Sequence, residues 1–291
     1  VLTKLCHELL AGGPPVGPLL EEGHYILDDR VWAHSAAILP AELDFSLQLL
    51  PEQPLADLID VIGVADELGF RACYSADETY HKDMWILFAA AAERTRRIRL
   101  GPEVTHVILR DPTMIAQQAA TLDELPGGRV EIVFSIGNLG MLDQYHVQWR
   151  GTRPLARLRE AHQVMRRFLD DGRIDFDGEF YRYTGLFTAA KPIQSRLPLK
   201  IGAMRGPGSF RLAGEIADGI HVACAHSAEA LRYAADHVRE GAARIERPLD
   251  EGFDFCASIL GAIGRDAAAA KEAARVAAAF YISSMSPEVV E

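Results

Sequence analysis

The sequence predicts an α/β protein in which parallel strands, each followed by a helix, close into a (β/α)8 barrel of the TIM type. Three observations lead to this fold class. The chain has 291 residues, and such a barrel needs roughly 250. From residue 44 onward, short apolar runs alternate with segments whose apolar residues recur at helical spacing. Residues 199–222 read as strand, turn, helix and strand, a crossover that joins parallel strands, and the chain lacks the switch-point pattern of an open dinucleotide-binding sheet.

The apolar runs predict seven barrel strands, at residues 45–50, 72–75, 98–105, 129–136, 199–203, from 220 onward, and 253–260. Helices are predicted after them, at residues 55–68, 84–95, 113–125, 155–170, 210–217, 228–245 and 266–283. Gly69 ends the first helix, and Asp218 with Gly219 ends the fifth. Residues 176–184 predict a small hairpin inserted before the fifth strand.

The two ends of the chain depart from this alternation. Residues 1–42 show no clean period and predict an N-terminal extension of unknown role, so the barrel is assigned to residues 43–291. No eighth strand is evident before residue 291, and we expect the barrel to be incomplete at the C-terminus.

The net charge limits the kinds of partner that the protein can have, and its cysteines indicate the compartment. Thirty Lys and Arg residues against 41 Asp and Glu give a net charge of −11, which disfavours nucleic acid and anionic membranes as partners. The sequence has no apolar run of about 18 residues and no signal-peptide pattern. Its four cysteines form no Cys-x-x-Cys motif, and Cys73 and Cys256 fall in predicted buried strands. These features predict a cytoplasmic protein with reduced thiols.

The most informative turn follows the fifth strand, at Ala203, Met204, Arg205, Gly206, Pro207, Gly208 and Ser209. Gly206 and Gly208 remove Cβ atoms where a backbone approaches a ligand, and the first amides of the next helix are free. Free amides and the positive end of the helix dipole favour an anion such as phosphate, and Arg205 adds a full positive charge. The alternative is that the segment is only a turn.

Polar residues also follow three earlier strands, and the carboxyl ends of barrel strands are where active sites lie. Asp77 and Glu78 follow the second strand; one of them, Glu78 before Asp77, is a candidate general acid, and the alternative is a helix N-cap. His106 follows the third strand and could polarise a substrate carbonyl or imine, or be structural. Motifs of zinc hydrolases, serine hydrolases and P-loop proteins are absent from the sequence.

Several of these segments together resemble one family. The runs are Gly206-Pro207 with residues 212–219, Ala76-Asp77-Glu78, residues 99–102, and Val104-Thr105. They are similar to the bacterial-luciferase-like superfamily, in particular to the deazaflavin-dependent oxidoreductases typified by methylenetetrahydromethanopterin reductase. The resemblance covers the chain from about Asp44 and implies a luciferase-like barrel that binds a flavin-type cofactor.

The resemblance assigns residues to the cofactor. It implies that the turn at residues 203–209 holds the phosphate and that a non-proline cis peptide between Glu103 and Val104 supports the ring. The further cofactor-binding candidates beside them are Thr105, Ser135, Gly137, Asn138 and Gly140. Two positions depart from the family pattern, because a small residue is commoner at Glu103 and asparagine at His106.

The resemblance also implies an activity. We expect an oxidoreductase that transfers a hydride between the deazaflavin coenzyme F420 and a small organic substrate with a C=N, C=C or C=O bond. The alternatives are an FMN-dependent luciferase-like monooxygenase, a non-catalytic flavin-binding barrel and a cofactor-free barrel lyase. A homodimer formed by the helices that flank the early strands is implied as well.

Overall fold

The computed structural model describes residues 44–223, 227–249, 252–262 and 264–283. The predicted N-terminal extension, residues 1–42, lies outside the described residues.

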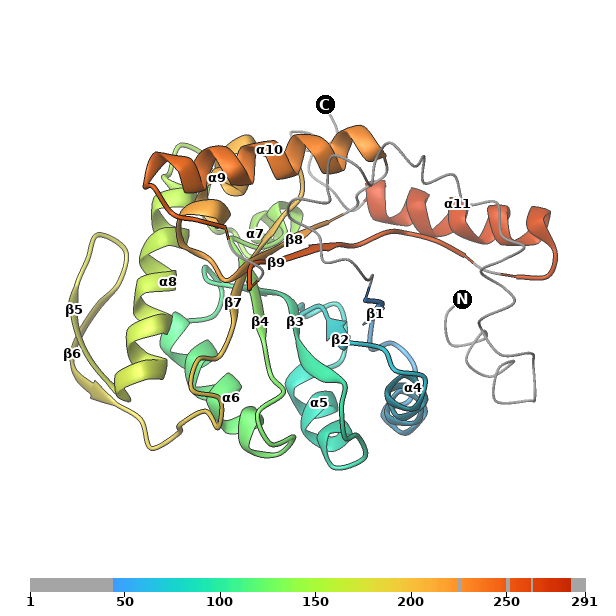
Figure 1. The fold of residues 1–291 in the computed structure, drawn as a ribbon, viewed down its shortest axis with the longest axis horizontal. Coiled ribbons are helices and arrows are strands. Elements are labelled where there is room, and N and C mark those ends of the chain that lie inside the picture. Colours follow the sequence, from blue (N-terminus) through green and yellow to red (C-terminus); the bar gives the residue numbers. More distant parts are fainter. Residues whose placement is uncertain (1–43, 224–226, 250–251, 263, 284–291) are drawn as a thin grey trace.

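A seven-stranded sheet forms the centre of the molecule, with helices on its outer side (Figure 1). Its order is β1-β2-β3-β4-β7-β8-β9, and every neighbouring pair is parallel. The strands are β1 Ser46–Leu49, β2 Ala72–Ser75, β3 Arg99–His106, β4 Ile132–Ser135, β7 Leu199–Ala203, β8 Gly219–Val222 and β9 Asp254–Ala257. Because all seven run in the same direction, their carboxyl ends lie at one edge of the sheet.

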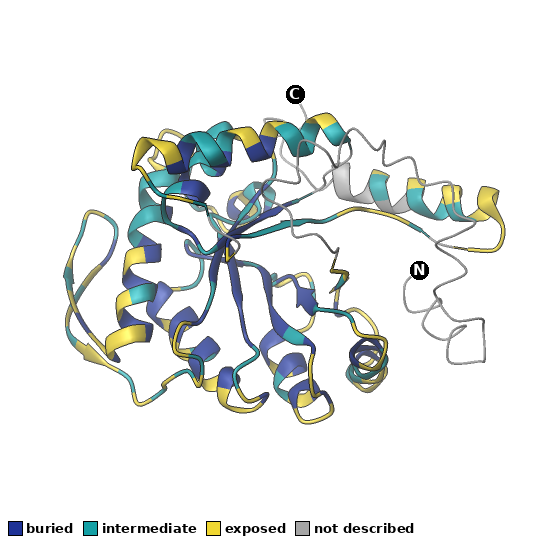
Figure 2. Ribbon diagram, in the orientation of Figure 1, coloured by how far each residue is buried: buried dark blue, intermediate teal, exposed yellow. Residues whose placement is uncertain are grey.

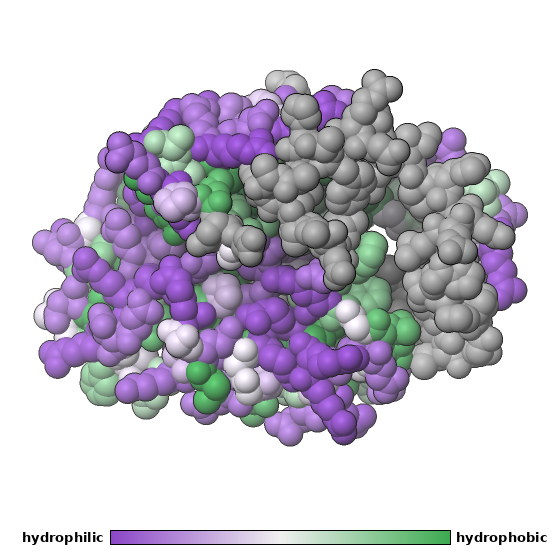
Figure 3. All heavy atoms as spheres, viewed as in Figure 1, coloured by the Kyte–Doolittle hydropathy of each residue, from purple (hydrophilic) through white to green (hydrophobic). Residues whose placement is uncertain are grey.

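The helices cover the outer face of this curled sheet and bury a continuous apolar layer against it. They are α4 Leu55–Glu67, α5 Met84–Ala92, α6 Pro112–Glu124, α7 Leu139–Gln144, α8 Pro154–Asp171, α9 Pro207–Ile216 and α10 Ala228–Arg244; the last described helix, α11 Ala267–Ser283, does not belong to this layer. Figure 2 shows β2, β3, β4, β7 and β8 mostly buried and β9 intermediate, with the sheet-facing sides of the surrounding helices buried and their outward sides exposed. The face seen in Figure 3 is mainly hydrophilic, with small hydrophobic patches between polar side chains. None of the helices in the described ranges is long and apolar enough to cross a membrane.

The sequence predictions of the elements are confirmed for all seven barrel strands and for the helices after them, with ends that differ by a few residues. The predicted hairpin at residues 176–184 is present but longer, with strands β5 Arg173–Asp177 and β6 Arg182–Phe187. It begins directly after α8 because Gly172 ends that helix in the left-handed conformation. Helix α7 was not predicted, since it has only six residues and too few turns to show a period.

The inner face of the sheet differs from the outer one, because it carries buried charged side chains beside a small apolar cluster. Glu131, the residue before β4, is fully buried, and its Oε1 is 2.7 Å from Lys200 Nζ and 3.4 Å from an Arg71 nitrogen. Lys200 also pairs with Asp254. Burial opposes the charge on Glu131, but Lys200, Arg71 and Arg99 hold the pKa of its carboxyl far below the usual range. Through Lys200, a network of ion pairs therefore links the residue before β4 with β7 and β9.

β1 and β9 are the two outer strands of the sheet, and neither has a second strand partner within the described segments. The described residues thus contain seven parallel strands of the sheet and no eighth. Figure 1 shows α11 lying apart from the helices that surround the sheet.

Candidate active site

The carboxyl edge of the sheet brings the predicted site residues together. β2, β3, β4 and β7 are consecutive neighbours, so the segments that follow them converge although they are far apart in sequence. All the residues predicted to act in catalysis or to bind the cofactor lie in the last residues of these strands or in the segments that follow them.

Asp77 is fully engaged with neighbouring side chains. Its carboxylate accepts two hydrogen bonds from Arg110, at 2.9 and 2.8 Å, and one at 2.7 Å from Thr105. The indole of Trp85 donates a fourth, at 3.2 Å. With its oxygens occupied in this way, Asp77 joins the end of β2 to β3, α5 and Arg110, and it is poorly placed to exchange a proton.

Glu78, the next residue, has a different environment. Its side chain is half-buried, and its carboxylate has no hydrogen bond or ion pair to any other residue that the structure describes. The carboxyl is therefore available to a molecule bound at the strand ends.

His106 is buried, and its Nε2 donates to the backbone oxygen of Asp77. Because that acceptor is a carbonyl, the ring proton is on Nε2. The lone pair of Nδ1 has no hydrogen-bond donor among the described residues. Burial lowers the pKa of His106, so the ring is neutral near pH 7. A Cβ at Gly137, where φ is +103°, would lie 2.6 Å from Nδ1. A neutral, covered ring without a free N–H favours a positioning role for His106 over the predicted polarisation of a substrate carbonyl.

The end of β3 contains the irregularity that the family resemblance implied. The Glu103–Val104 peptide is cis, as predicted, and the register of β3 against β4 shifts between Glu103 and Thr105. A Cβ on Gly202 of β7 would overlap the Val104 side chain, so the two strands are in close contact there. The Glu103 side chain points into the barrel, towards His221 and Ser258. Its backbone, rather than its carboxylate, is thus the part of Glu103 at the strand ends.

The loop after β4 is shaped by its own side chains. Ser135 Oγ accepts a hydrogen bond from the Gly137 amide at 2.9 Å. Asn138 caps α7, because its Oδ1 accepts from the amides of Gly140 and Met141. Because the cap uses only Oδ1, the Nδ2 group of Asn138 is available to donate a hydrogen bond to a ligand.

The turn after β7 leads directly into α9. Gly206 is the N-cap residue, Pro207 is the first helical residue, and no side chain caps the helix. The Gly208 amide has no hydrogen-bond acceptor in the described part of the chain. A Cβ at Gly206 would meet nothing closer than 3.8 Å, whereas one at Gly208 would lie 2.6 Å from Leu155 of α8. Gly206 thus borders open space at the strand ends, while Gly208 allows α9 to pack on α8.

The family model for luciferase-like monooxygenases matches residues 34–290. The chain belongs to this family.

Individual members of the family can be compared with this luciferase-like chain. It is 27% identical over 249 residues to the 5,10-methylenetetrahydromethanopterin reductase of Archaeoglobus fulgidus, covering 86% of this chain and 73% of the relative. To the enzyme of the same name from Methanopyrus kandleri it is 30% identical over 263 residues, covering 86% and 74%. The solved structure of the coenzyme F420-dependent tetrahydromethanopterin reductase from Methanopyrus kandleri superposes with a TM-score of 0.77 at 29% identity, over 83% of this chain and 73% of that one.

Several residues that organise the site of this luciferase-like chain escaped sequence reasoning: Trp85, Arg110, His221 and Ser258. Trp85 lies in α5 and Arg110 lies in the connection between β3 and α6. Because neither directly follows a strand, their positions in the sequence did not mark them as site residues. His221 did carry a signal, because a titratable residue within an apolar strand needs a partner inside the barrel. Among the described residues, no group of three or more His, Cys, Asp or Glu side chains is arranged to hold a metal ion.

Proposed function

We propose that this chain is an oxidoreductase that transfers a hydride between coenzyme F420 and a small organic substrate with a C=N, C=C or C=O bond. The observation that carries the proposal is the convergence of the turn at Gly206 with the ends of β2, β3 and β4. The similarity to reductases whose names state methylenetetrahydromethanopterin or F420 supports the choice of cofactor.

The turn after β7 fits a phosphate group. The space beside Gly206 would be filled by a Cβ at that position, and the Gly208 amide lacks an acceptor. The positive end of α9 and the exposed Arg205 add favourable charge. Ala203, Met204, Pro207 and Ser209 complete the segment that would hold the phosphate.

The ends of β3 and β4 fit the ring system. The backbone of Glu103 and Val104, with the Val104 side chain, would support the ring from below, and Thr105 is fixed by Asp77. Asn138 Nδ2 can donate to the ring or its chain, while Ser135, Gly137 and Gly140 shape the loop around it. Bound F420 supplies the hydride chemistry, and the protein supplies position and electrostatics.

Glu78 is the residue that we assign to proton transfer, because its carboxyl is half-buried and without a partner in the described chain. Asp77 and His106 hold the loop that carries it, through the contacts of Asp77 with Arg110 and of His106 with the Asp77 carbonyl. This arrangement presents a single carboxyl to a substrate at the strand ends.

The alternative is an FMN-dependent monooxygenase, which the name of the matching family favours. Titration with F420 and with FMN, followed by fluorescence, separates the two. We expect F420 to bind at least about tenfold more tightly than FMN. A preference for FMN, with oxygen consumption by protein loaded with reduced FMN, would establish the monooxygenase instead, because a 5-deazaflavin does not activate oxygen in that way. Binding of neither would refute both and leave a cofactor-free barrel.

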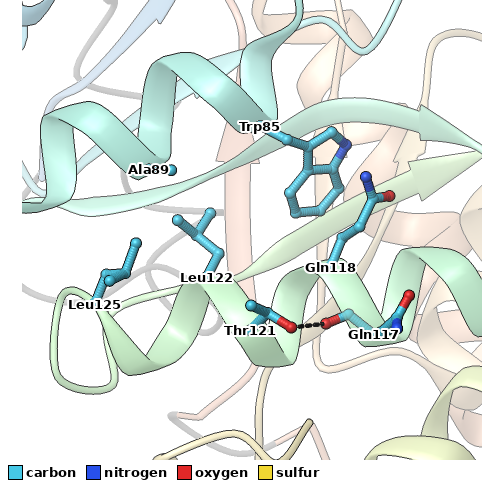
Figure 4. A pocket seen from close by; sticks show the side chains of 7 residues that line it. All are labelled: Trp85, Ala89, Gln117, Gln118, Thr121, Leu122 and Leu125. Carbon is cyan, nitrogen blue, oxygen red and sulfur yellow. Dashed lines mark hydrogen bonds between the residues drawn. The ribbon is translucent and has the colours of Figure 1, made fainter. Parts of the chain in front are cut away.

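We also propose a homodimer that forms through α5 and α6. A surface cavity of about 210 Å³ lies between these helices, lined by Trp85, Ala89, Gln117, Gln118, Thr121, Leu122 and Leu125 (Figure 4). Ile86 of α5 and Met114 of α6 are exposed apolar residues on the same pair of helices. A cytoplasmic location is part of the same proposal, supported by the free thiols of Cys73 and Cys256.

A further inference from the structure

Three polar side chains inside the barrel join β3 to two strands that are not its neighbours. Glu103 belongs to β3, His221 to β8, and Ser258 follows β9, while β4 and β7 lie between β3 and β8. His221 Nδ1 is 3.1 Å from Glu103 Oε1, and Ser258 Oγ donates a hydrogen bond to the same oxygen. Glu103 is 7% exposed and His221 0%. The Glu103 carboxylate is therefore anchored from the opposite side of the barrel.

The two ionisable members of this trio carry opposite charges. Burial raises the pKa of Glu103, but His221, Ser258 and the nearby Lys200 outweigh it and lower the pKa below the usual range. Burial lowers the pKa of His221, and the Glu103 carboxylate reverses this and raises it to about 10. The remaining close neighbours are Cys256, opposite His221 on β9, and Tyr74, whose ring lies edge-on at 4.5 Å.

This anchor adjoins the proposed ring support. Val104, next to Glu103, carries the register shift of β3 and contacts Gly202, one residue before the phosphate turn begins. The Val104 carbonyl also accepts from the Asp77 amide at 3.3 Å. The position of Val104 thus depends on Glu103 from below, on β7 from one side and on the β2 loop from the other.

We propose that His221 and Ser258 are positioning residues for the cofactor ring, acting through the Glu103 carboxylate. The inference rests on the proposed function, because it concerns the same site. Without the imidazolium, a buried Glu103 would have to take up a proton or move towards solvent. Either change would displace Val104, whereas the phosphate turn keeps its own contacts.

The test compares His221→Gln with His162→Gln, a matched control at another buried histidine, which lies in α8, away from the loops at the strand ends. Binding of F420 is titrated by fluorescence, the absorption spectrum of the bound ring is recorded, and inorganic phosphate is used as a competitor. We expect His221→Gln to weaken F420 binding at least about tenfold and to shift the ring spectrum, with the inhibition constant of phosphate unchanged. His162→Gln should leave all three values near those of the wild type.

A second pair of variants tests the same anchor if His221→Gln does not fold. Ser258→Ala should weaken F420 binding by about threefold to tenfold, and Ser258→Thr, which keeps the hydroxyl, should restore it. An unchanged ring spectrum and affinity in both His221→Gln and Ser258→Ala would overturn this proposal, as would an equal loss in His162→Gln. Failure of the wild type to bind either F420 or FMN would instead refute the proposed function, and this inference with it.

Discussion

Asp77 and Glu78 are adjacent in sequence but differ in their surroundings. Four hydrogen bonds occupy the carboxylate of Asp77, and none to the described residues occupies that of Glu78. We predict that Glu78→Gln keeps F420 affinity near the wild-type value and lowers kcat by about 10²-fold or more, the usual scale of general acid–base catalysis. Steady-state kinetics with each F420-dependent substrate found for the enzyme would measure it. Equal rates would remove Glu78 from proton transfer.

Asp77→Asn is the matched variant of the neighbouring residue. It weakens the contact with Arg110, so we expect a lower melting temperature together with weaker cofactor binding. If Asp77→Asn lowers the rate but leaves stability and cofactor affinity unchanged, proton transfer belongs to Asp77 rather than to Glu78.

Lys200 is a buried cation whose role is structural. It lies between Glu131 and Asp254 inside the barrel. Lys200→Met leaves the buried Glu131 without its nearest counter-charge and should cost about 3–5 kcal/mol of unfolding free energy. Urea unfolding measures the loss, with the exposed Lys191→Met as a control that should change little. A cost below about 1 kcal/mol would show that Arg71 and Arg99 suffice.

His162 makes stability depend on pH. Burial, and then Arg166, lower its pKa from 6.5 to about 4. Between these values the unfolded chain binds a proton that the folded chain does not, so stability falls as pH decreases from about 6.5 to about 4, by up to about 3 kcal/mol. His162→Phe should remove this part of the acid sensitivity, measured as the difference in unfolding free energy between pH 7 and pH 4.5. An identical difference in the variant would contradict the assignment.

At the scale of an element, the turn between β7 and α9 contains two glycines with different roles, Gly206 and Gly208. Gly206 has φ −73° and open space where a Cβ would stand, so Gly206→Val should fold with an almost unchanged melting temperature. The valine would occupy the phosphate space and weaken F420 binding at least about tenfold in a fluorescence titration. Wild-type affinity in this variant would refute the phosphate assignment.

Gly208→Ala is the comparison within the same turn. Its Cβ would press on Leu155, so we expect lower stability from the contact between α9 and α8. The pair thus distinguishes a glycine that leaves room for a ligand from one that leaves room for a helix.

At the scale of the molecule, the apolar surface of α5 and α6 predicts association. Ile86 is 63% exposed and Met114 50%. The double variant Ile86→Glu with Met114→Glu should sediment as a monomer under conditions where the wild type sediments as a dimer, because charges would be buried at the contact. Phe187→Glu on the β5–β6 hairpin, at a residue 76% exposed, should leave the dimer intact. A wild type that is monomeric at all concentrations would refute the interface.

Most of the fold could be predicted because its signals are local. The strand Ala72–Ser75 and the strand Leu199–Ala203 have the bounds that their apolar runs predict, and α4 ends just before Gly69, as predicted. α7 was missed because its signal is one capping residue, Asn138, ahead of a single turn and a half. The direction of the Glu103 side chain was also not predictable, since the irregularity in β3 breaks the alternation that assigns faces in a strand.

The sequence by itself determined the barrel-type alternation, the family and the segments that meet at the strand ends, because periodicity and motif order are properties of neighbouring residues. It also placed Asp77 beside Glu78 without distinguishing them. Only the tertiary structure decided that Arg110 and Thr105 occupy Asp77 while Glu78 stays available, and that Glu103 faces His221 across the barrel. The physical reason is that hydrogen bonds and buried ion pairs depend on distances of a few ångströms between strands, which folding sets and sequence separation does not.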